Sequence, residues 1–225
     1  FLLGRQLLNR ATEDGFRRAV GEFAQAVALE PAYSAALAGL ALAEAYASDY
    51  TDSDAAMLAG RERAGQAAER AVASDPALGE AYTARAVLRF VFDLDWNGGD
   101  ADFAQALVFN PGDVMTHWQY SRLLAALGRL PEALASASQA TQLDPLSAQA
   151  WEIRARYELA SGDIAAARRS LEQALDLAPD HGRAPLGLGM AALLDGEPTA
   201  AREWYARSNN ETFQLAGLAM AAHDL

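Results

Sequence analysis

Apolar and small side chains recur at helical spacing through most of the chain, in pairs of segments separated by short polar turns. In the clearest pair, one helical pattern runs from Trp151 to Ala160, Gly162 and Asp163 interrupt it, and a second pattern runs from Ile164 to Leu177. Pro179 lacks an amide hydrogen and disfavours helix in the residue before it, so it ends the second segment. The pattern predicts an antiparallel pair of α-helices, a helix hairpin.

The hairpin pattern repeats along the chain. Pro111, Pro145 and Pro179 lie 34 residues apart, and each closes an apolar and acidic run such as FAQALVFNP, ASQATQLDP or LEQALDLAP. Pro76 and Pro31 extend the series toward the N-terminus, with an insertion between them. A fixed period of this length is typical of a repeat array. We therefore expect an all-α chain, with residues 1–225 forming a single array of about six hairpins and a C-terminal helix.

Capping residues and small side chains refine this expectation. Helices are predicted at Leu2–Asn9 and Glu13–Leu29, with Thr12 as the N-cap of the second. After the polar linker SDYTDSD, Asp52 or Ser53 should cap a helix that ends at Ser74. Small residues where two helices cross closely are expected at Ala155, Ala167 and Ala174.

The repeat resembles the tetratricopeptide repeat. The matching residues of the clearest copy are Trp151, Ala155, Gly162, Ala167, Leu171, Ala174 and Pro179. Arg154 and Glu158 depart from the pattern, which usually has Leu and Tyr there. The resemblance implies an α-solenoid, a right-handed superhelix of antiparallel hairpins whose first helices line a concave groove.

A finer resemblance concerns the runs FVFDLDW, HWQYSRLLAALGRLPEALASASQATQLDPLS and GLAMAAHDL. They look like the tetratricopeptide region of bacterial signalling proteins, in which a nucleotide-cyclase domain or a winged-helix domain (CadC/ToxR-like) precedes the repeats. Both ends of the chain, FLLGRQLLNR and LAGLAMAAHDL, have helical patterns without a cap or stop signal. We therefore expect a fragment of a longer polypeptide.

Composition narrows the classes of partner. The chain has no cysteine, which excludes disulfides and thiolate metal sites but does not separate the bacterial cytoplasm from the periplasm. Its 18 basic residues are all arginine, and with 30 acidic residues the formal net charge is −12. Such a field repels phosphate backbones and anionic lipid, so neither nucleic acid nor a membrane surface is an expected partner. No apolar run is long enough for membrane insertion.

The sequence offers little chemistry. Asp93, Asp95 and Asn97 match the first half of a calcium loop, but the twelfth position is Ala104 where a bidentate Glu is needed. An acidic turn between helices is the favoured interpretation. The three histidines have no ligand-like spacing, and a chain without lysine cannot contain a Walker motif. We expect no catalytic site, no metal and no cofactor.

The expected function is therefore that of a non-catalytic module that binds a protein or peptide in its concave groove. Trp118, flanked by Arg122 and Arg156, is the predicted anchor, because Trp and Arg dominate interface hot spots. Any of the aromatic residues could instead serve packing alone. Candidate groove residues, taken by register from the first helices, are Tyr46, Phe90, Met115, Trp118, Arg122, Glu152, Arg156 and Met190.

Two other classes of function remain open from the sequence. One is a structural module that spaces neighbouring domains or forms a homodimer, because terminal helices without caps expose apolar faces. The other is a sensor of a small molecule or of calcium, which would use the apolar groove or the half calcium loop.

Overall fold

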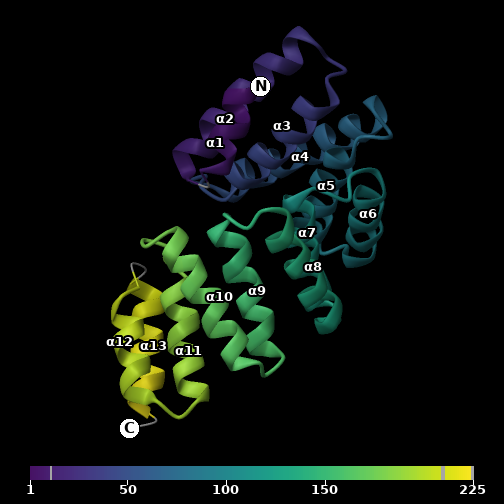
Figure 1. Ribbon diagram of the computed structural model, residues 1–225. Helices are drawn as coiled ribbons and strands as arrows, with labels where there is room; N and C mark the ends of the chain where they lie inside the picture. Colours follow the sequence, from purple (N-terminus) through teal and green to yellow (C-terminus); the bar gives the residue numbers. More distant parts are fainter. Residues whose placement is uncertain (11, 209–210, 224–225) are drawn as a thin grey trace. The chain divides into compact units, whose positions relative to one another are not determined.

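A computed structural model describes residues 1–10, 12–208 and 211–223, and these residues form helices and no strands (Figure 1). The prediction of an all-α fold is confirmed. The chain divides into two compact units, Phe1–Thr116 and His117–Leu225.

The first unit contains three helix hairpins and the first turn of α7. Its elements are α1 (Leu2–Asn9), α2 (Glu13–Leu29), α3 (Ser34–Ser48), α4 (Asp54–Ser74), α5 (Gly79–Leu88), the π-helix η1 (Arg89–Asp93) and α6 (Trp96–Phe109), followed by the start of α7 (Val114–Ala126).

The second unit begins within α7 and continues through consecutive antiparallel helices to the end of the described chain. Its further elements are α8 (Leu130–Leu143), α9 (Ala148–Ala160), α10 (Ile164–Leu177), α11 (Ala184–Leu194), α12 (Pro198–Ala206) and α13 (Glu211–His223).

Local signals in the sequence account for the helix ends. The hydroxyls of Thr12 and Ser53 accept hydrogen bonds from the first turns of α2 and α4, so Ser53 and not Asp52 is the cap of α4. Gly128, Gly162 and Gly196, again 34 residues apart, adopt φ angles of 75°, 82° and 74° in the turns within successive hairpins. Glycine suits this left-handed conformation because it has no Cβ atom.

Large rings pack against glycines where successive helices meet. The ring of Phe23 in α2 is fully buried, and a Cβ atom added at Gly39 of α3 would lie 2.5 Å from it. In the second unit, the Tyr205 ring of α12 lies against Gly189 of α11 in the same way, also at 2.5 Å, and against Gly217 of α13. The missing Cβ atoms therefore make the space that the two rings fill.

The predicted crossing of α9 and α10 is present in the structure. Ala155, Ala167 and Ala174 have no exposed surface and share one apolar cluster with Leu171 and Leu188. Small side chains at these positions let the two helices approach closely.

An ion-pair network joins α5, η1 and α6 in the first unit. Asp102 is 4% exposed and accepts hydrogen bonds from Nε and Nη2 of Arg85 at 2.8 and 2.7 Å, while Nη1 of Arg89 lies 2.9 Å from its other contact oxygen, Oδ2. The hydrogen bond to Asp102 raises the pKa of Arg85 above its usual range, more than burial lowers it. Arg89 is the first residue of the π-helix, so the network anchors this irregular turn to α6.

Candidate functional site: a pocket between α9 and α11

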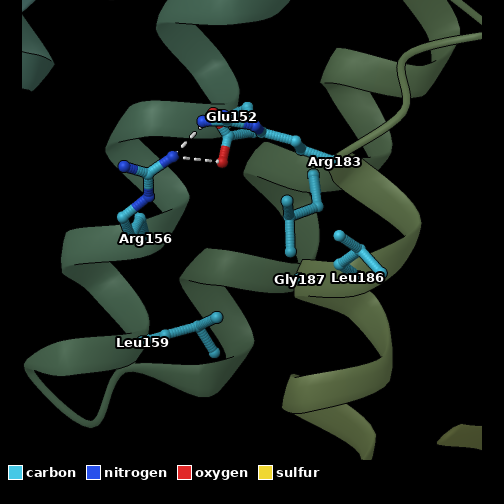
Figure 2. Close-up of a pocket in the computed structure, with 7 residues that line it drawn as sticks. Glu152, Arg156, Leu159, Arg183, Leu186 and Gly187 are labelled. Atoms are coloured by element: carbon cyan, nitrogen blue, oxygen red, sulfur yellow. Dashed lines mark hydrogen bonds and ion pairs between the residues drawn. The ribbon is translucent and has the colours of Figure 1, made fainter. Parts of the chain in front are cut away.

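A pocket of about 330 Å³ lies in the second unit, between the first helices of two successive hairpins (Figure 2). Leu159, Leu171 and Leu186 give it an apolar lining. The polar groups at the pocket are Glu152 and Arg156 of α9 and Arg183, the residue before α11. The arrangement offers an apolar side chain a place to bury and offers two guanidinium groups to its flanking polar atoms.

A charged pair marks one wall of this pocket. Glu152 is 6% exposed, and Nη2 of Arg156 donates hydrogen bonds to its two carboxylate oxygens at 2.8 and 3.2 Å. The two residues are one helical turn apart on α9, which brings their side chains together. Figure 2 shows the Arg183 side chain reaching toward Glu152 from the opposite wall. Two cations and one anion leave the pocket with one net positive charge in an acidic chain.

Local sequence fixes the two walls. The hydroxyl of Ser147 caps α9, and α11 begins with Pro185 in its first turn, where a missing amide hydrogen costs no helical bond. Gly187 opens the pocket, because a Cβ atom there would lie 2.7 Å from the Leu171 side chain. The pocket thus depends on the same exchange of glycine for a large neighbour that is found in the core.

Two of the predicted groove residues, Glu152 and Arg156, come together in this pocket. Met190 lies one turn beyond Leu186 on α11, is 37% exposed and does not line the pocket. Arg183, Leu171 and Gly187 were not among the predicted residues. Arg183 precedes the helical pattern, and Leu171 belongs to a second helix, so a register limited to first helices misses both.

The predicted anchor lies on α7. Trp118 is partly buried against the cluster of Leu124, Ala137 and Tyr157, and the Arg122 guanidinium lies 6.0 Å from the centroid of its ring. The Tyr157 hydroxyl lies 3.4 Å from Ser121 Oγ, and burial raises its pKa. Trp118 therefore also contributes to the packing of its hairpin, so its replacement would test stability together with binding.

The remaining candidates belong to the first unit. Tyr46 is partly buried and stacks on Phe16 with ring centroids 5.1 Å apart, and its other neighbour is Phe92 of η1 at 6.4 Å. Phe90 lies in η1 and Met115 in the first turn of α7, both partly buried. These aromatic residues pack the hairpins of the first unit together.

The half calcium loop is divided between helices. Asp93 ends η1, Asp95 caps α6 by accepting the Gly98 amide at 2.9 Å, and Asn97 is already inside α6. Leu94 between them has a left-handed φ of 57°. Across the described residues, no group of three or more His, Cys, Asp or Glu side chains is placed to hold a metal ion. Nor does any described helix combine the length and apolarity needed to cross a bilayer.

Two overlapping stretches of the second unit, residues 119–165 and 154–210, match the family model of the tetratricopeptide repeat. These residues are tetratricopeptide repeats. The match begins in α7, extends past α12 and includes both walls of the pocket. The model is that of a repeat and not of an enzyme family. No curated protein matches the chain.

Solved structures extend the likeness to nearly the whole chain. A chain of the APC/C hetero-tetramer Cut9–Hcn1 aligns with a TM-score of 0.74 and 14% identity, over 98% of this chain and 45% of that one. PilW, a widely conserved type IV pilus biogenesis factor, aligns at 0.70 and 17% identity over 97% and 98% of the two chains. YrrB, a tetratricopeptide protein with an unusual peptide-binding site, aligns at 0.59 and 15% identity over 90% and 98%. Identities this low establish the fold alone, a tetratricopeptide-type helical array.

Proposed function

We propose that this chain is a non-catalytic module that binds a protein partner through an extended peptide segment, with the pocket between α9 and α11 as a main contact. The observation that carries the proposal is the pocket itself, where three leucines lie beside Arg156 and Arg183. An apolar side chain of the peptide would fill the cavity, and carboxylate or carbonyl oxygens next to it would accept hydrogen bonds from the arginines. YrrB, with the same fold, is described as having a peptide-binding site, which supports this class of ligand.

Selection of peptides from a random library on the immobilised protein tests the proposal, with affinities then measured by fluorescence polarisation. Arg183→Glu reverses one charge at the pocket and should weaken the selected peptides by about tenfold or more, since charge-assisted contacts are worth about 1.5–3 kcal/mol. Arg202→Glu changes an exposed arginine of α12 by the same amount and should have no effect. Equal binding to the parent and to Arg183→Glu would refute this use of the pocket.

We also propose that the module belongs to a bacterial signalling or regulatory protein. The resemblance of FVFDLDW and the segments after it to the repeat regions of such proteins supports this context. The proposal requires a nucleotide-cyclase or winged-helix domain in the same polypeptide. The complete reading frame tests it, and a different neighbouring domain would remove the support.

A second candidate function is self-association, which the apolar surface of the outer helices favours. Leu2 of α1 and Leu215 of α13 are 78% and 60% exposed, and Leu3 and Met220 add to the same two helices. Light scattering at two protein concentrations should show a mass that rises with concentration if these faces pair copies of the chain. A constant monomer mass would exclude this function.

A further inference from the structure

A second pocket, of about 280 Å³, lies on a different face of α9 and is lined mainly by polar side chains. Trp151, Arg154 and Glu158 come from α9, and Arg169, Ser170 and Gln173 come from α10. The α9 residues of this pocket are offset by roughly a third of a helical turn from those of the first pocket, given 3.6 residues per turn. The site is therefore separate from the proposed peptide site.

A buried carboxylate lies at the base of this pocket. Glu158 is 3% exposed, and its two oxygens accept hydrogen bonds from Arg154 Nε and from Ser170 Oγ, each at 2.7 Å. Arg154 Nη1 donates to Thr141 Oγ1 at 3.4 Å, and the guanidinium carbon lies 5.3 Å from the centroid of the Trp151 ring. These contacts hold the Arg154 guanidinium in one orientation, and Glu158 has no free oxygen for a further donor.

The neighbouring repeats lack this network. The positions 34 residues before and after Arg154 hold Tyr120 and Leu188, and those around Glu158 hold Leu124 and Ala192. Leu124, Leu188 and Ala192 are buried in apolar packing. Replacing a buried ion pair with well-packed apolar residues is often neutral or stabilising, so stability alone does not explain the polar pair in this repeat.

The groups left over in the pocket are hydrogen-bond donors. Arg154 Nη2 makes no hydrogen bond to any described residue, and neither does the exposed side chain of Arg169. The Gln173 amide is likewise without a partner in the described chain. With Glu158 fully engaged, the pocket presents two cations against one satisfied anion, together with the half-buried face of Trp151.

We propose that this pocket binds a compact anion, whose carboxylate or phosphate oxygens accept hydrogen bonds from the guanidinium groups of Arg154 and Arg169. Guanidinium forks match both kinds of oxyanion, and a second charged pair would be needed to hold more than one or two negative charges. Gln173 supplies a further donor, and Trp151 packs against the carbon part of the ligand. The partner is thus a small anionic molecule of a size that fits about 280 Å³.

Calorimetric titration of the full chain tests the proposal, with succinate as the carboxylate probe, inorganic phosphate as the phosphate probe, and sodium chloride at matched ionic strength as the reference. At least one probe should bind with one site per chain, and the stronger one identifies the kind of oxyanion. Arg169→Gln should weaken that probe by about tenfold or more without changing the melting temperature, because Arg169 has no partner in the fold.

Two more variants separate this site from folding and from the first pocket. Arg154→Leu with Glu158→Ala gives this repeat the residues of the next one, and it should abolish binding while the chain keeps its helicity and melts no earlier. Arg183→Gln alters the first pocket only and should leave anion binding unchanged. The proposal is overturned if neither probe binds more tightly than chloride, or if Arg183→Gln weakens binding as much as Arg169→Gln does.

Discussion

At the scale of single residues, the polar groups buried in the second unit differ in how well they are satisfied. Glu152 and Glu158 are almost fully buried, and each is paired with an arginine one turn away on α9. The hydroxyl of Tyr205 is also buried, yet it has no hydrogen-bond partner among the described residues. A buried polar atom without a partner lowers stability, because it gives up its hydrogen bond to water and gains nothing in exchange.

Tyr205→Phe should therefore stabilise the protein by about 1 kcal/mol, since it removes an unsatisfied hydroxyl and keeps the ring between Gly189 and Gly217. Chemical denaturation at neutral pH measures the change. Tyr157→Phe is the matched control, because its hydroxyl is bonded to Ser121 and its loss should not stabilise. A lower denaturation midpoint for Tyr205→Phe would mean that the hydroxyl has a partner after all.

The same residue gives a pH dependence. Burial raises the pKa of Tyr205, so the folded chain keeps this proton at a pH where the unfolded chain, with a pKa of about 10, has lost it. The unfolded state then binds fewer protons, and the stability that is fully present below about pH 10 falls as the pH rises above it. Denaturation between pH 9 and 11 should show a smaller loss for Tyr205→Phe than for the parent. Parallel curves would show that Tyr205 ionises normally in the fold.

At the scale of elements, the close crossing of α9 and α10 depends on alanines. Ala167→Leu should destabilise this hairpin by about 1–3 kcal/mol, because three added carbon atoms must enter a packed cluster. Ala165→Leu places the same side chain on the exposed face of α10 and should be close to neutral. Thermal melting of the two variants checks this prediction, which fails if both melt alike.

The ion-pair network of the first unit gives a second prediction at this scale. Asp102→Asn should cost about 3–5 kcal/mol, because it leaves the guanidinium groups of Arg85 and Arg89 without their buried partner. Glu69→Gln removes the exposed partner of Arg85 and should cost less than about 1 kcal/mol. Urea denaturation compares the two variants. Similar small losses would show that solvent already screens Asp102.

Most elements could be predicted from the sequence, because their signals are local. The bounds of α1, α2 and α10 agree with the expected ranges, and the turn glycines lie in the left-handed turns as the repeat pattern required. The π-helix η1 could not be predicted, since its extra residue per turn leaves no mark on the hydrophobic period and its anchor, Asp102, is more than ten residues away.

The candidate sites were less predictable than the elements. Glu152 and Arg156 follow from the register of first helices, but Arg183 and Leu171 enter the pocket through the packing of three helices. The polar pocket was visible only as a departure from the repeat pattern at Arg154 and Glu158, and Ser170 joins them through a hydrogen bond across the hairpin. Contacts of this kind depend on tertiary packing, which periodicity does not describe.

At the scale of the whole molecule, the excess of acidic residues governs behaviour in solution. The formal net charge is −12 at pH 7 and the isoelectric point is about 4.6. Repulsion between copies should therefore vanish as the pH approaches 4.6, and solubility should pass through a minimum there. Turbidity between pH 7 and pH 4 measures this effect. A clear solution throughout would mean that the folded surface charge differs from the sum over the sequence.

The pairing of rings with glycines also limits how such an array can grow. A hairpin whose second helix carries a large ring, as α12 does with Tyr205, accepts as its successor only a helix with glycine at the facing position, as α13 has with Gly217. A hairpin copied from elsewhere in the chain would bring a Cβ atom into the volume of the ring. The hairpins are therefore not interchangeable parts, and gene duplication can lengthen this chain only where ring and glycine are inherited together.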